Sequence, residues 1–295
     1  MQPQLVLHLY KEENKKKPKL VGDYLITEKL DGIYGYIDYN TELGWGYIHS
    51  RQERKIPSLY WAKELFIDLF APTYNFRLIF EITIDGADFH TTNGILNRSV
   101  GDCQAYEAIF NLHDLIELDT YFLDSRKYRA LARWDKLQDI SVGSSKGSIR
   151  HVPLLAVSDD RQVWEHYFQY VLAKGGEGIV LKKVGSIYEP GKRNSSLMKM
   201  KLEEEAYIEC VDIFYTVGKK GKSNMNITLR RKSGVEIVIR VGKHSEIAKI
   251  ESDKDYILGK VVKIEAMEEL ASGAFREPRY KKVCNDIKLI DKRVI

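Results

Sequence analysis

Apolar and polar positions divide the first seventy residues into strand-like and helix-like segments. Aromatic and β-branched residues dominate positions 24–48, where Asn40-Thr41 and Gly44 interrupt them, and this pattern predicts several strands. Apolar residues at helical spacing follow over Ser58–Phe70 and predict one helix. The chain therefore opens with a sheet whose strands are joined by tight turns.

The next part of the chain, up to about residue 204, mixes both periods. Runs of β-branched and aromatic residues predict strands, and a spacing of three to four apolar residues predicts helices. The predicted strands are Arg77–Ile84, Tyr106–Leu112, Gly178–Lys183 and Leu197–Leu202, and the predicted helices are Ser125–Leu137 and Asp159–Ala173. Mixed strands and helices of this kind indicate an α/β domain over residues 1–204.

Short strands replace this mixture after the acidic triplet Glu203-Glu204-Glu205, which fits either a hinge or a solvated strand end. One helix is predicted, over Ser245–Ile250. The predicted strands are Tyr207–Tyr215, Asn226–Arg231, Glu236–Val241 and Gly259–Met267. Closely spaced strands predict a small barrel of the OB type over residues 205–295, and the chain as a whole is expected to be α+β.

Composition and charge narrow the class of protein. The chain has 295 residues, enough for two ordinary domains, and lacks an apolar run of membrane-spanning length. Residues 1–204 contain 27 Lys and Arg against 28 Asp and Glu, a net charge of −1, whereas residues 205–295 contain 19 against 14, a net of +5. The basic second part suits contact with a polyanion. Three widely spaced cysteines and the absence of a secretory signal predict a cytoplasmic protein that is not secreted.

The pattern Lys29-Leu30-Asp31-Gly32 follows the first predicted strand and offers a lysine amine as a nucleophile. Further motifs follow in order. They are Ser50-Arg51, Phe80-Glu81-Ile82, Glu177 to Lys182, Leu197 to Lys201, and Arg276-Glu277-Pro278-Arg279-Tyr280. The series resembles the covalent nucleotidyltransferase superfamily of ATP-dependent DNA ligases, RNA ligases and mRNA capping enzymes. The resemblance is strongest to minimal DNA ligases of the viral or phage type.

This resemblance implies that Lys29 attacks the α-phosphate of ATP and holds AMP through a phosphoramide bond. Asp31 is expected near the ribose and the metal-bound phosphate, and Gly32 is expected to let the backbone approach the ligand. Relatives usually have an arginine where this chain has Tyr34. Arg51 and Arg54 are the candidates to replace it and to contact the phosphates of DNA.

The resemblance also assigns carboxylates to the ribose or to Mg²⁺, with Mn²⁺ as an alternative metal. Glu81 is one candidate, because it shares a strand face with Thr83 and Asp85, although that face would also suit the wet side of a sheet. Glu177 is the other. Sparse carboxylates are what a Mg²⁺ site requires, since the ion keeps waters and phosphate oxygens as ligands.

A histidine and three lysines complete the expected nucleotide site. His113 occupies the position of an aromatic residue that stacks on adenine, and a structural role for it is equally compatible with the sequence. Lys199 and Lys201 share a strand face, with Met198, Met200 and Leu202 facing the core. These lysines would neutralise a triphosphate and favour the neutral form of Lys29. Lys182 is assigned to the nucleotide as well, with Lys183 as the alternative inward residue.

The C-terminal motif and two basic stretches complete the expected site residues. Arg276 is expected to serve the β- and γ-phosphates, although Cys284 and Ile287 stand where relatives have Arg and Lys. A lysine- and glycine-rich loop is predicted to contact a DNA backbone through Lys219, Lys220 and Lys222. The role of the stretch Lys15-Lys16-Lys17 stays open.

Together the sequence and the resemblance predict an ATP-dependent DNA ligase that seals 5′-phosphate/3′-hydroxyl nicks in duplex DNA. The partner is nicked double-stranded DNA without sequence preference, the expected cofactors are ATP and Mg²⁺, and the protein is expected to be a monomer. An mRNA guanylyltransferase or an RNA ligase would share the lysine chemistry. A non-catalytic nucleic-acid-binding relative is the alternative from another class.

Overall fold

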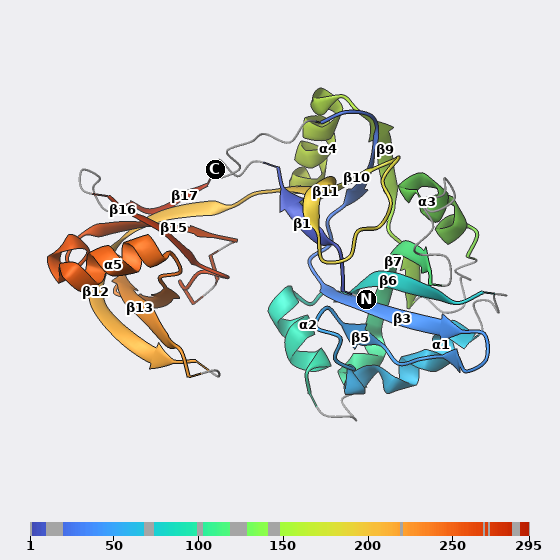
Figure 1. The fold of residues 1–295 in the computed structure, drawn as a ribbon, viewed down its shortest axis with the longest axis horizontal. Coiled ribbons are helices and arrows are strands. Elements are labelled where there is room, and N and C mark those ends of the chain that lie inside the picture. The colour runs from blue at the N-terminus through green and yellow to red at the C-terminus, as the bar shows by residue number, and fades with distance from the viewer. Residues whose placement is uncertain are drawn as a thin grey trace. The chain divides into compact units, whose positions relative to one another are not determined.

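The computed structural model describes residues 2–9, 20–67, 74–98, 103–118, 129–140, 148–218, 221–267, 269–270, 272–284 and 290–294. The chain divides into two compact units, Met1–Lys201 and Leu202–Ile295 (Figure 1). Across the described ranges, every helix is too short or too polar to span a membrane.

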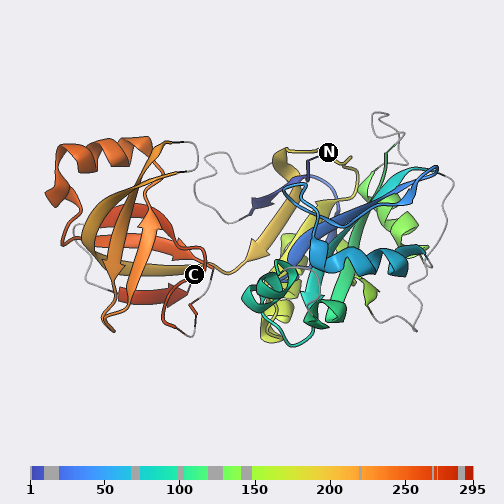
Figure 2. The same cartoon turned by 90° about the horizontal axis from the view of Figure 1, so that it is seen from below.

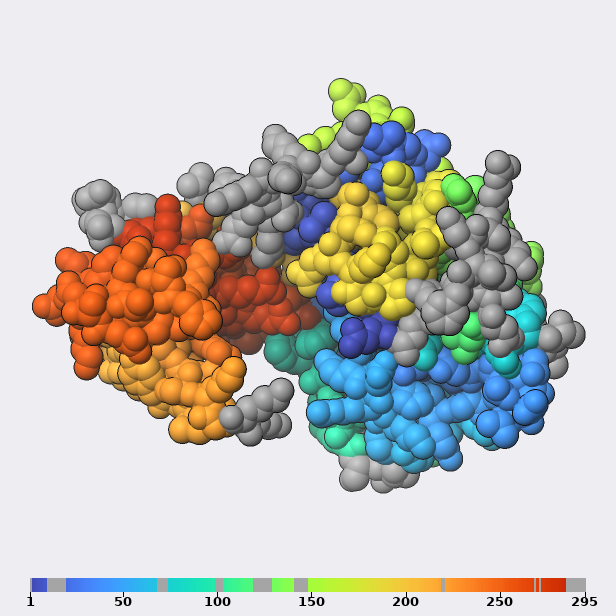
Figure 3. Space-filling model, in the orientation of Figure 1, coloured from blue at the N-terminus to red at the C-terminus, as the bar shows by residue number. Residues whose placement is uncertain are grey.

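The first unit contains a five-stranded sheet that we call the β2 sheet. Its strands, in spatial order, are β1 (Leu5–His8), β11 (Arg193–Lys201), β10 (Gly178–Lys183), β2 (Tyr24–Glu28) and β9 (Leu154–Ser158). Strands β1 and β11 are parallel and the other pairs are antiparallel. The space-filling view shows the dark blue N-terminal strand beside the yellow residues of β11 (Figure 3).

Helix α4 (Arg161–Ala173) covers one face of the β2 sheet. Trp164 and Phe168 of this helix are buried against Tyr24 and Ile26. The helix begins at Arg161, directly after the acidic pair, and the Asp160 side chain caps it by accepting a hydrogen bond of 2.8 Å from the Gln162 N–H. The opposite face of the sheet is left for the site described below.

A second sheet, the β6 sheet, forms the rest of the first unit. Its path is β4 (Gly44–Trp45), β3 (Ile33–Asn40), β6 (Phe76–Ile84), β7 (Ala108–Glu117) and β8 (Ile149–His151), with β5 (His49–Ser50) paired to β3. One face packs on 3₁₀ and α-helical segments around buried Phe66, Phe80 and Phe110. These segments are η1 (Pro57–Ala62), α1 (Lys63–Ile67), α2 (Phe89–Leu96) and η2 (Cys103–Glu107).

Helix α3 (Ala130–Gln138) connects the two sheets. Its Arg133 bonds to Asp114 on β7, while Ala130 and Trp134 pack on Leu25 of β2. The sequence places a helix over Ser125–Leu137, and the described part of that range agrees except for its first residue, Arg129, which precedes the helix. Residues 125–128 lie outside the described ranges.

Several elements differ in their bounds from the sequence prediction, and two of them differ in type over part of their length. Ser58–Phe70 is not one helix, because Leu59 has φ −107° and ψ 15°, and a 3₁₀ segment therefore precedes the short α1. The strand predicted over Tyr106–Leu112 begins later, at Ala108, since Tyr106 belongs to the 3₁₀ turn η2. In both places tertiary packing against the aromatic core replaces the pattern expected from local spacing.

The second unit is a single sheet in which all described pairings are antiparallel. Its path is β14 (Glu236–Arg240), β13 (Ser223–Arg230), β12 (Glu204–Val217), β15 (Val261–Ala266) and β16 (Arg279–Cys284), and β17 (Ile290–Val294) also pairs with β12. Figure 2 shows these strands curving around a core, with α5 (His244–Ser252) beside them and followed by η4 (Lys254–Tyr256). The expected α+β organisation, mixed sheets with helices and then a sheet consistent with an OB fold, is confirmed.

The division between the units falls after Lys201, close to the expected boundary after Glu204. Glu204 and Glu205 are the first residues of β12, where they pair with Ala266 and Glu265. The acidic triplet therefore leads into a strand.

Candidate active site

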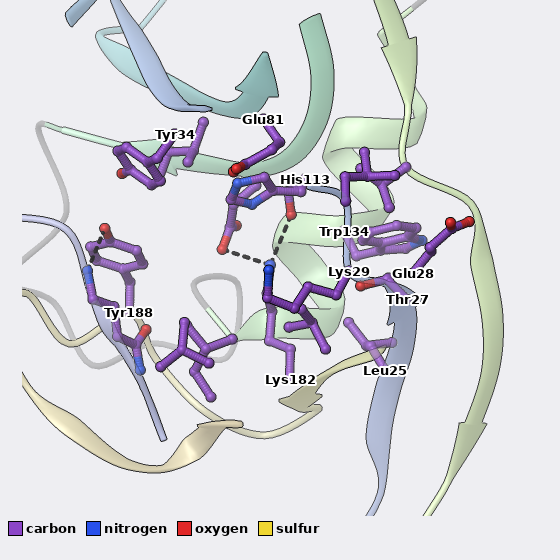
Figure 4. Close-up of a pocket in the computed structure, with 18 of the residues that line it drawn as sticks. Leu25, Thr27, Glu28, Lys29, Tyr34, Glu81, His113, Trp134, Lys182 and Tyr188 are labelled. Carbon is purple, nitrogen blue, oxygen red and sulfur yellow. Dashed lines mark hydrogen bonds and ion pairs between the residues drawn. The ribbon is translucent and has the colours of Figure 1, made fainter. Parts of the chain in front are cut away.

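A pocket lies between the β2 sheet and the β6 sheet of the first unit (Figure 4). The β2 sheet and its N-terminal flank contribute Gln4, Val6, Leu25, Thr27, Glu28, Val180, Lys182 and Leu197. The β6 sheet contributes Tyr34, Ile79, Glu81, His113 and Asp114. Segments between the strands add Lys29, Leu30, Arg51, Trp134, Val152 and Tyr188. Charged residues from both sheets therefore meet over largely apolar walls.

Lys29 lies directly after β2, at the rim where the two sheets approach. Its backbone N–H donates to the Gly178 carbonyl at 2.8 Å, because β2 and β10 pair antiparallel up to this point. Its ammonium group forms an ion pair with Glu177. The other Glu177 oxygen lies 3.6 Å from the Lys201 ammonium, whose side chain is 2% exposed. One carboxylate thus sits between two lysines.

Gly32 allows the loop after Lys29 to touch strand β6. A Cβ atom at this position would lie 2.4 Å from the Ile82 carbonyl oxygen and 2.9 Å from Cγ of Glu81. The resemblance predicts that the missing side chain makes room for a ligand, but the nearest neighbour is the backbone of strand β6. Glycine is required here because it brings the lysine loop against the strand that holds Glu81.

Glu81 faces the pocket from the middle of β6. Phe80, Ile82 and Ile84 are buried in the core on the opposite face, so the predicted alternation is confirmed. Burial raises the pKa of the Glu81 carboxyl to about 7, and the charges of Glu177 and Asp31 add to the effect. The cations Lys29 and Arg51 offset it in part. Glu81 therefore lies in a poorly solvated site, and both cationic and anionic side chains lie near its carboxylate.

The two carboxylates expected to hold a metal differ in their fit. Both oxygens of Glu177 face lysine ammonium groups, which leaves this carboxylate paired with protein cations. Glu81 fits better, since Mg²⁺ needs one or two carboxylates and completes its shell with water and phosphate oxygens. In the described ranges, no group of three or more His, Cys, Asp or Glu side chains is arranged to hold a metal.

A buried charge cluster joins strand β7, strand β10 and helix α3. The Lys182 ammonium donates to the His113 carbonyl and to Oδ2 of Asp114, each at 2.8 Å (Figure 4). Arg133 donates to both oxygens of Asp114, at 2.8 and 3.2 Å. Burial opposes ionisation of Asp114, and the two cations nevertheless hold its pKa well below the usual range. Burial also lowers the pKa of Lys182.

Lys182, not Lys183, is thus the lysine that lines the pocket. Strict alternation from Glu177 suggests otherwise, but Glu177 precedes β10 and is not part of its alternation. His113 also lines the pocket, and its ring lies 6.3 Å from that of Tyr34. Burial, with the neighbouring Lys182 cation, lowers the pKa of His113 to about 3. The ring is therefore neutral at physiological pH and has a face available for stacking.

Of the two arginines proposed to replace the family's arginine, Arg51 reaches the pocket. Strand β5 pairs with β3 so that Ser50 lies opposite Gly35, which brings the next residue over Tyr34. The Arg51 guanidinium carbon lies 5.2 Å from the centre of the Tyr34 ring. Arg54 is exposed and does not line the pocket.

Other candidates lie near the pocket or in the second unit. Asp31 acts on Glu81 electrostatically without lining the pocket, and Lys199 shares the strand face of pocket-lining Leu197.

The residues that alternate with these lysines were predicted to face the core. Met198 and Met200 are buried as predicted, whereas Leu202 is exposed and the prediction for it is wrong. Arg276 (buried) and Lys222 (exposed) belong to the second unit. Lys219, Lys220 and the stretch 15–17 lie outside the described residues.

Several residues that line the pocket are not predicted from the sequence. Leu25 and Thr27 were within reach, because alternation along β2 puts them on the same face as Lys29. Trp134 and Tyr188 had no comparable signal, since each comes from a segment remote in sequence. Their place depends on how α3 and the segment after β10 fold back over the sheets.

The comparison with known families identifies the fold. The model of the ATP-dependent DNA ligase domain matches residues 10–201, which include the whole described pocket apart from Gln4 and Val6. The chain belongs to the ATP-dependent DNA ligase family. This family explains why a lysine after a strand, a carboxylate pair and a basic strand converge between two sheets.

Relatives of known structure or curated identity agree with this placement. DNA ligase 4 of Eremothecium gossypii is 25% identical over 233 residues, which cover 71% of this chain and 23% of that protein. The chain thus spans about a quarter of the length of this curated relative. A solved Lig E DNA ligase is 19% identical with a TM-score of 0.71, covering 96% of this chain and 99% of that one. The bacteriophage T7 ATP-dependent DNA ligase in complex with ATP is 18% identical with a TM-score of 0.56, covering 96% and 98%.

Proposed function

We propose that the chain seals nicks in duplex DNA with ATP as the source of AMP. The observation that supports this most directly is Lys29, which lies in the pocket at the meeting point of two sheets in an ATP-dependent DNA ligase domain. AMP would pass first to Lys29, then to the 5′-phosphate of a nick. The adjacent 3′-hydroxyl would finally displace AMP and close the strand.

In the first step the Lys29 amine forms a bond to the α-phosphorus while the bond to pyrophosphate breaks. Glu177 touches this amine and is placed to take the proton that the amine must lose. Lys201 holds Glu177 from the other side, which keeps the carboxylate oriented. In this scheme Arg51, which lines the pocket, donates to phosphate oxygens.

The nucleotide base would lie between the apolar walls and His113. The neutral ring of His113 offers a stacking face, and Trp134, Val180 and Leu25 line the apolar side. Mg²⁺ would neutralise charge on the phosphates during transfer, and Glu81 is the residue to hold it. Arg276 is proposed to act on the pyrophosphate end of ATP.

The proposed partner is a nicked duplex recognised through its backbone by a monomeric enzyme. The excess of basic residues after residue 204 supports this, and Lys222 is exposed in the loop that was predicted to contact DNA. Repair, replication or recombination would be the setting of such an activity, and a viral or phage origin is proposed from the resemblance of its motifs to minimal ligases of that type.

The test is covalent labelling by ATP labelled at the α-phosphate, in the presence of Mg²⁺. Label should remain on the denatured wild-type chain and be absent from Lys29→Ala, because the substituted side chain lacks the nucleophile. Lys192→Ala is the matched control, since that lysine is exposed and lies outside the pocket. The labelled chain should then seal a nicked duplex.

Label that persists in Lys29→Ala would move the nucleophile to another residue. Label from GTP alone would favour an mRNA guanylyltransferase. Absence of label from either nucleotide in the wild-type chain would favour a non-catalytic relative that binds nucleic acid.

A further inference from the structure

Arg133 has no place in the chemistry described so far, yet it is among the most deeply buried charges of the first unit. It is 4% exposed, and so is the Asp114 that it binds. Burying an ion pair costs free energy that hydrophobic residues of the same volume would not. A buried arginine next to a ligand pocket therefore calls for a reason beyond stability.

The geometry of the cluster gives such a reason, because Asp114 links Arg133 to a third residue, Lys182. The two N–H groups of Arg133 engage both oxygens of Asp114, and Oδ2 of Asp114 also accepts from the Lys182 ammonium at 2.8 Å. The His113 carbonyl accepts a second Lys182 N–H at 2.8 Å. Within the described part of the chain these two acceptors fix the ammonium group, and its third N–H is left for an acceptor on a bound nucleotide.

The net charge of the Arg133–Asp114–Lys182 cluster also favours a contact between Lys182 and a bound nucleotide. Asp114 alone would neutralise Lys182 and draw it away from a ligand. With Arg133 on the same carboxylate, two cations share one anion and the cluster keeps a net positive charge at the pocket wall. A poorly solvated positive charge attracts an electron-rich ligand more strongly than an exposed one.

Helix α3 anchors the arrangement. The Arg133 side chain also donates to the Ser186 carbonyl at 3.4 Å, and its guanidinium carbon lies 6.0 Å from the ring centre of pocket-lining Tyr188. The next residue of the helix, Trp134, itself lines the pocket. A single helical turn therefore supplies one wall residue and the residue that orients Lys182.

We propose that Arg133 is a positioning residue for nucleotide binding, which acts through Asp114 to hold the Lys182 ammonium group in place and aim it at the nucleotide. This assignment rests on the proposed function. It gives a role in ATP binding to a residue that does not line the pocket.

The experiment measures ATP affinity directly, by calorimetric titration in the Lys29→Met background so that no reaction follows binding. Arg133→Met preserves length and removes the charge, and it should weaken ATP binding by about tenfold or more, the effect of losing a charge-assisted contact. Arg133→Lys restores a charge beside Asp114 without the two-pronged contact and should recover part of the affinity.

The matched control is Arg77→Met. Arg77 is 6% exposed and donates to both oxygens of Asp38 at 2.7 and 2.8 Å, but it does not itself line the pocket. Both substitutions should lower the thermal unfolding temperature, because each removes a buried guanidinium that donates to both oxygens of a carboxylate. ATP affinity should stay within about twofold of the parent in Arg77→Met.

A double-mutant cycle separates positioning from a general structural effect. In a Lys182→Met background, Arg133→Met should change ATP affinity by less than about twofold, because the residue through which it acts is gone. Independent, additive losses would overturn the assignment, and so would equal losses in Arg133→Met and Arg77→Met. Unchanged affinity in Arg133→Met, with ATP bound by the parent chain, overturns this assignment alone. A parent chain that binds no ATP overturns the proposed function and this assignment with it.

Discussion

The two units of the chain bury charged side chains in different places. The described interior of the second unit is formed by aliphatic residues such as Ile208, Ile227 and Ile264, each with no exposed surface. The second unit also buries Glu205 and Arg276, whereas the first unit buries Asp114 and Arg133 between its two sheets, next to the pocket. Since an unpaired buried charge costs several kcal/mol, charges are kept inside a protein where partners and a ligand compensate them.

This contrast separates stability from chemistry. In the second unit a substitution in the core should change the free energy of unfolding and leave the nucleotide pocket intact. In the first unit a substitution between the sheets should change binding or proton affinity even where the fold survives. Substitutions in the two units can therefore be compared by measuring the free energy of unfolding and ATP binding separately.

Removal of the second unit should have the greatest consequence. A chain that ends at Lys201 should still unfold cooperatively, because Met1–Lys201 contains both sheets and their cores. It should lose most self-adenylation, since Arg276 and its neighbours are proposed to serve the pyrophosphate end of ATP. Calorimetry and labelling with ATP would measure the two properties separately. Full labelling by the shortened chain would contradict the role assigned to residues 202–295.

Ile227→Ala should destabilise the second unit without touching the pocket. The side chain is fully buried, and its loss should lower the free energy of unfolding by about 2–5 kcal/mol. ATP affinity should remain at the wild-type value, because every residue of the pocket lies in the first unit. Denaturant titration and ATP titration provide the two readouts.

Val238→Ala is the matched control for that substitution. Val238 lies on the neighbouring strand β14 and is 56% exposed, so its loss should cost no more than about 0.5 kcal/mol. A comparable loss of stability from both substitutions would remove the distinction between buried and exposed positions of this sheet.

Glu81→Gln should produce the most specific effect, a change in how stability depends on pH. Because the pKa of Glu81 is about 7 in the folded chain, above the ordinary value of 4.5, the folded state binds more protons than the unfolded state between these values. The contribution of Glu81 to the free energy of unfolding is therefore greatest at low pH. It decreases as pH rises from about 4.5 to 7 and changes little above that.

Glutamine does not ionise, so Glu81→Gln should lack this decrease. Denaturant titrations at several pH values should show wild-type stability falling, relative to the variant, across the window from about 4.5 to 7. Parallel curves for the two proteins would mean that Glu81 is ionised over the whole range and that its surroundings are better solvated than the structure indicates.

Local periodicity accounted for much of the fold. Strand Gly178–Lys183 has the bounds that the sequence predicts, and alternation along β6 places Glu81 opposite a buried apolar face. Helix α4 ends at Ala173 as predicted and begins at Arg161, two residues later. These elements follow from side-chain pattern, turn residues and capping, which act between residues close in sequence.

The sequence by itself determined the family, the nucleophile candidate Lys29, and an α+β chain whose second part is mostly strand with one short helix. Tertiary structure decided which charges meet. It placed Glu177 between Lys29 and Lys201 and selected Lys182 over Lys183. It also joined Lys182 to Arg133 through Asp114. These contacts link residues up to 148 positions apart, and no local pattern specifies such a distance in the fold. They arise because two sheets and one helix pack together and leave a partly buried space in which each charge needs a partner.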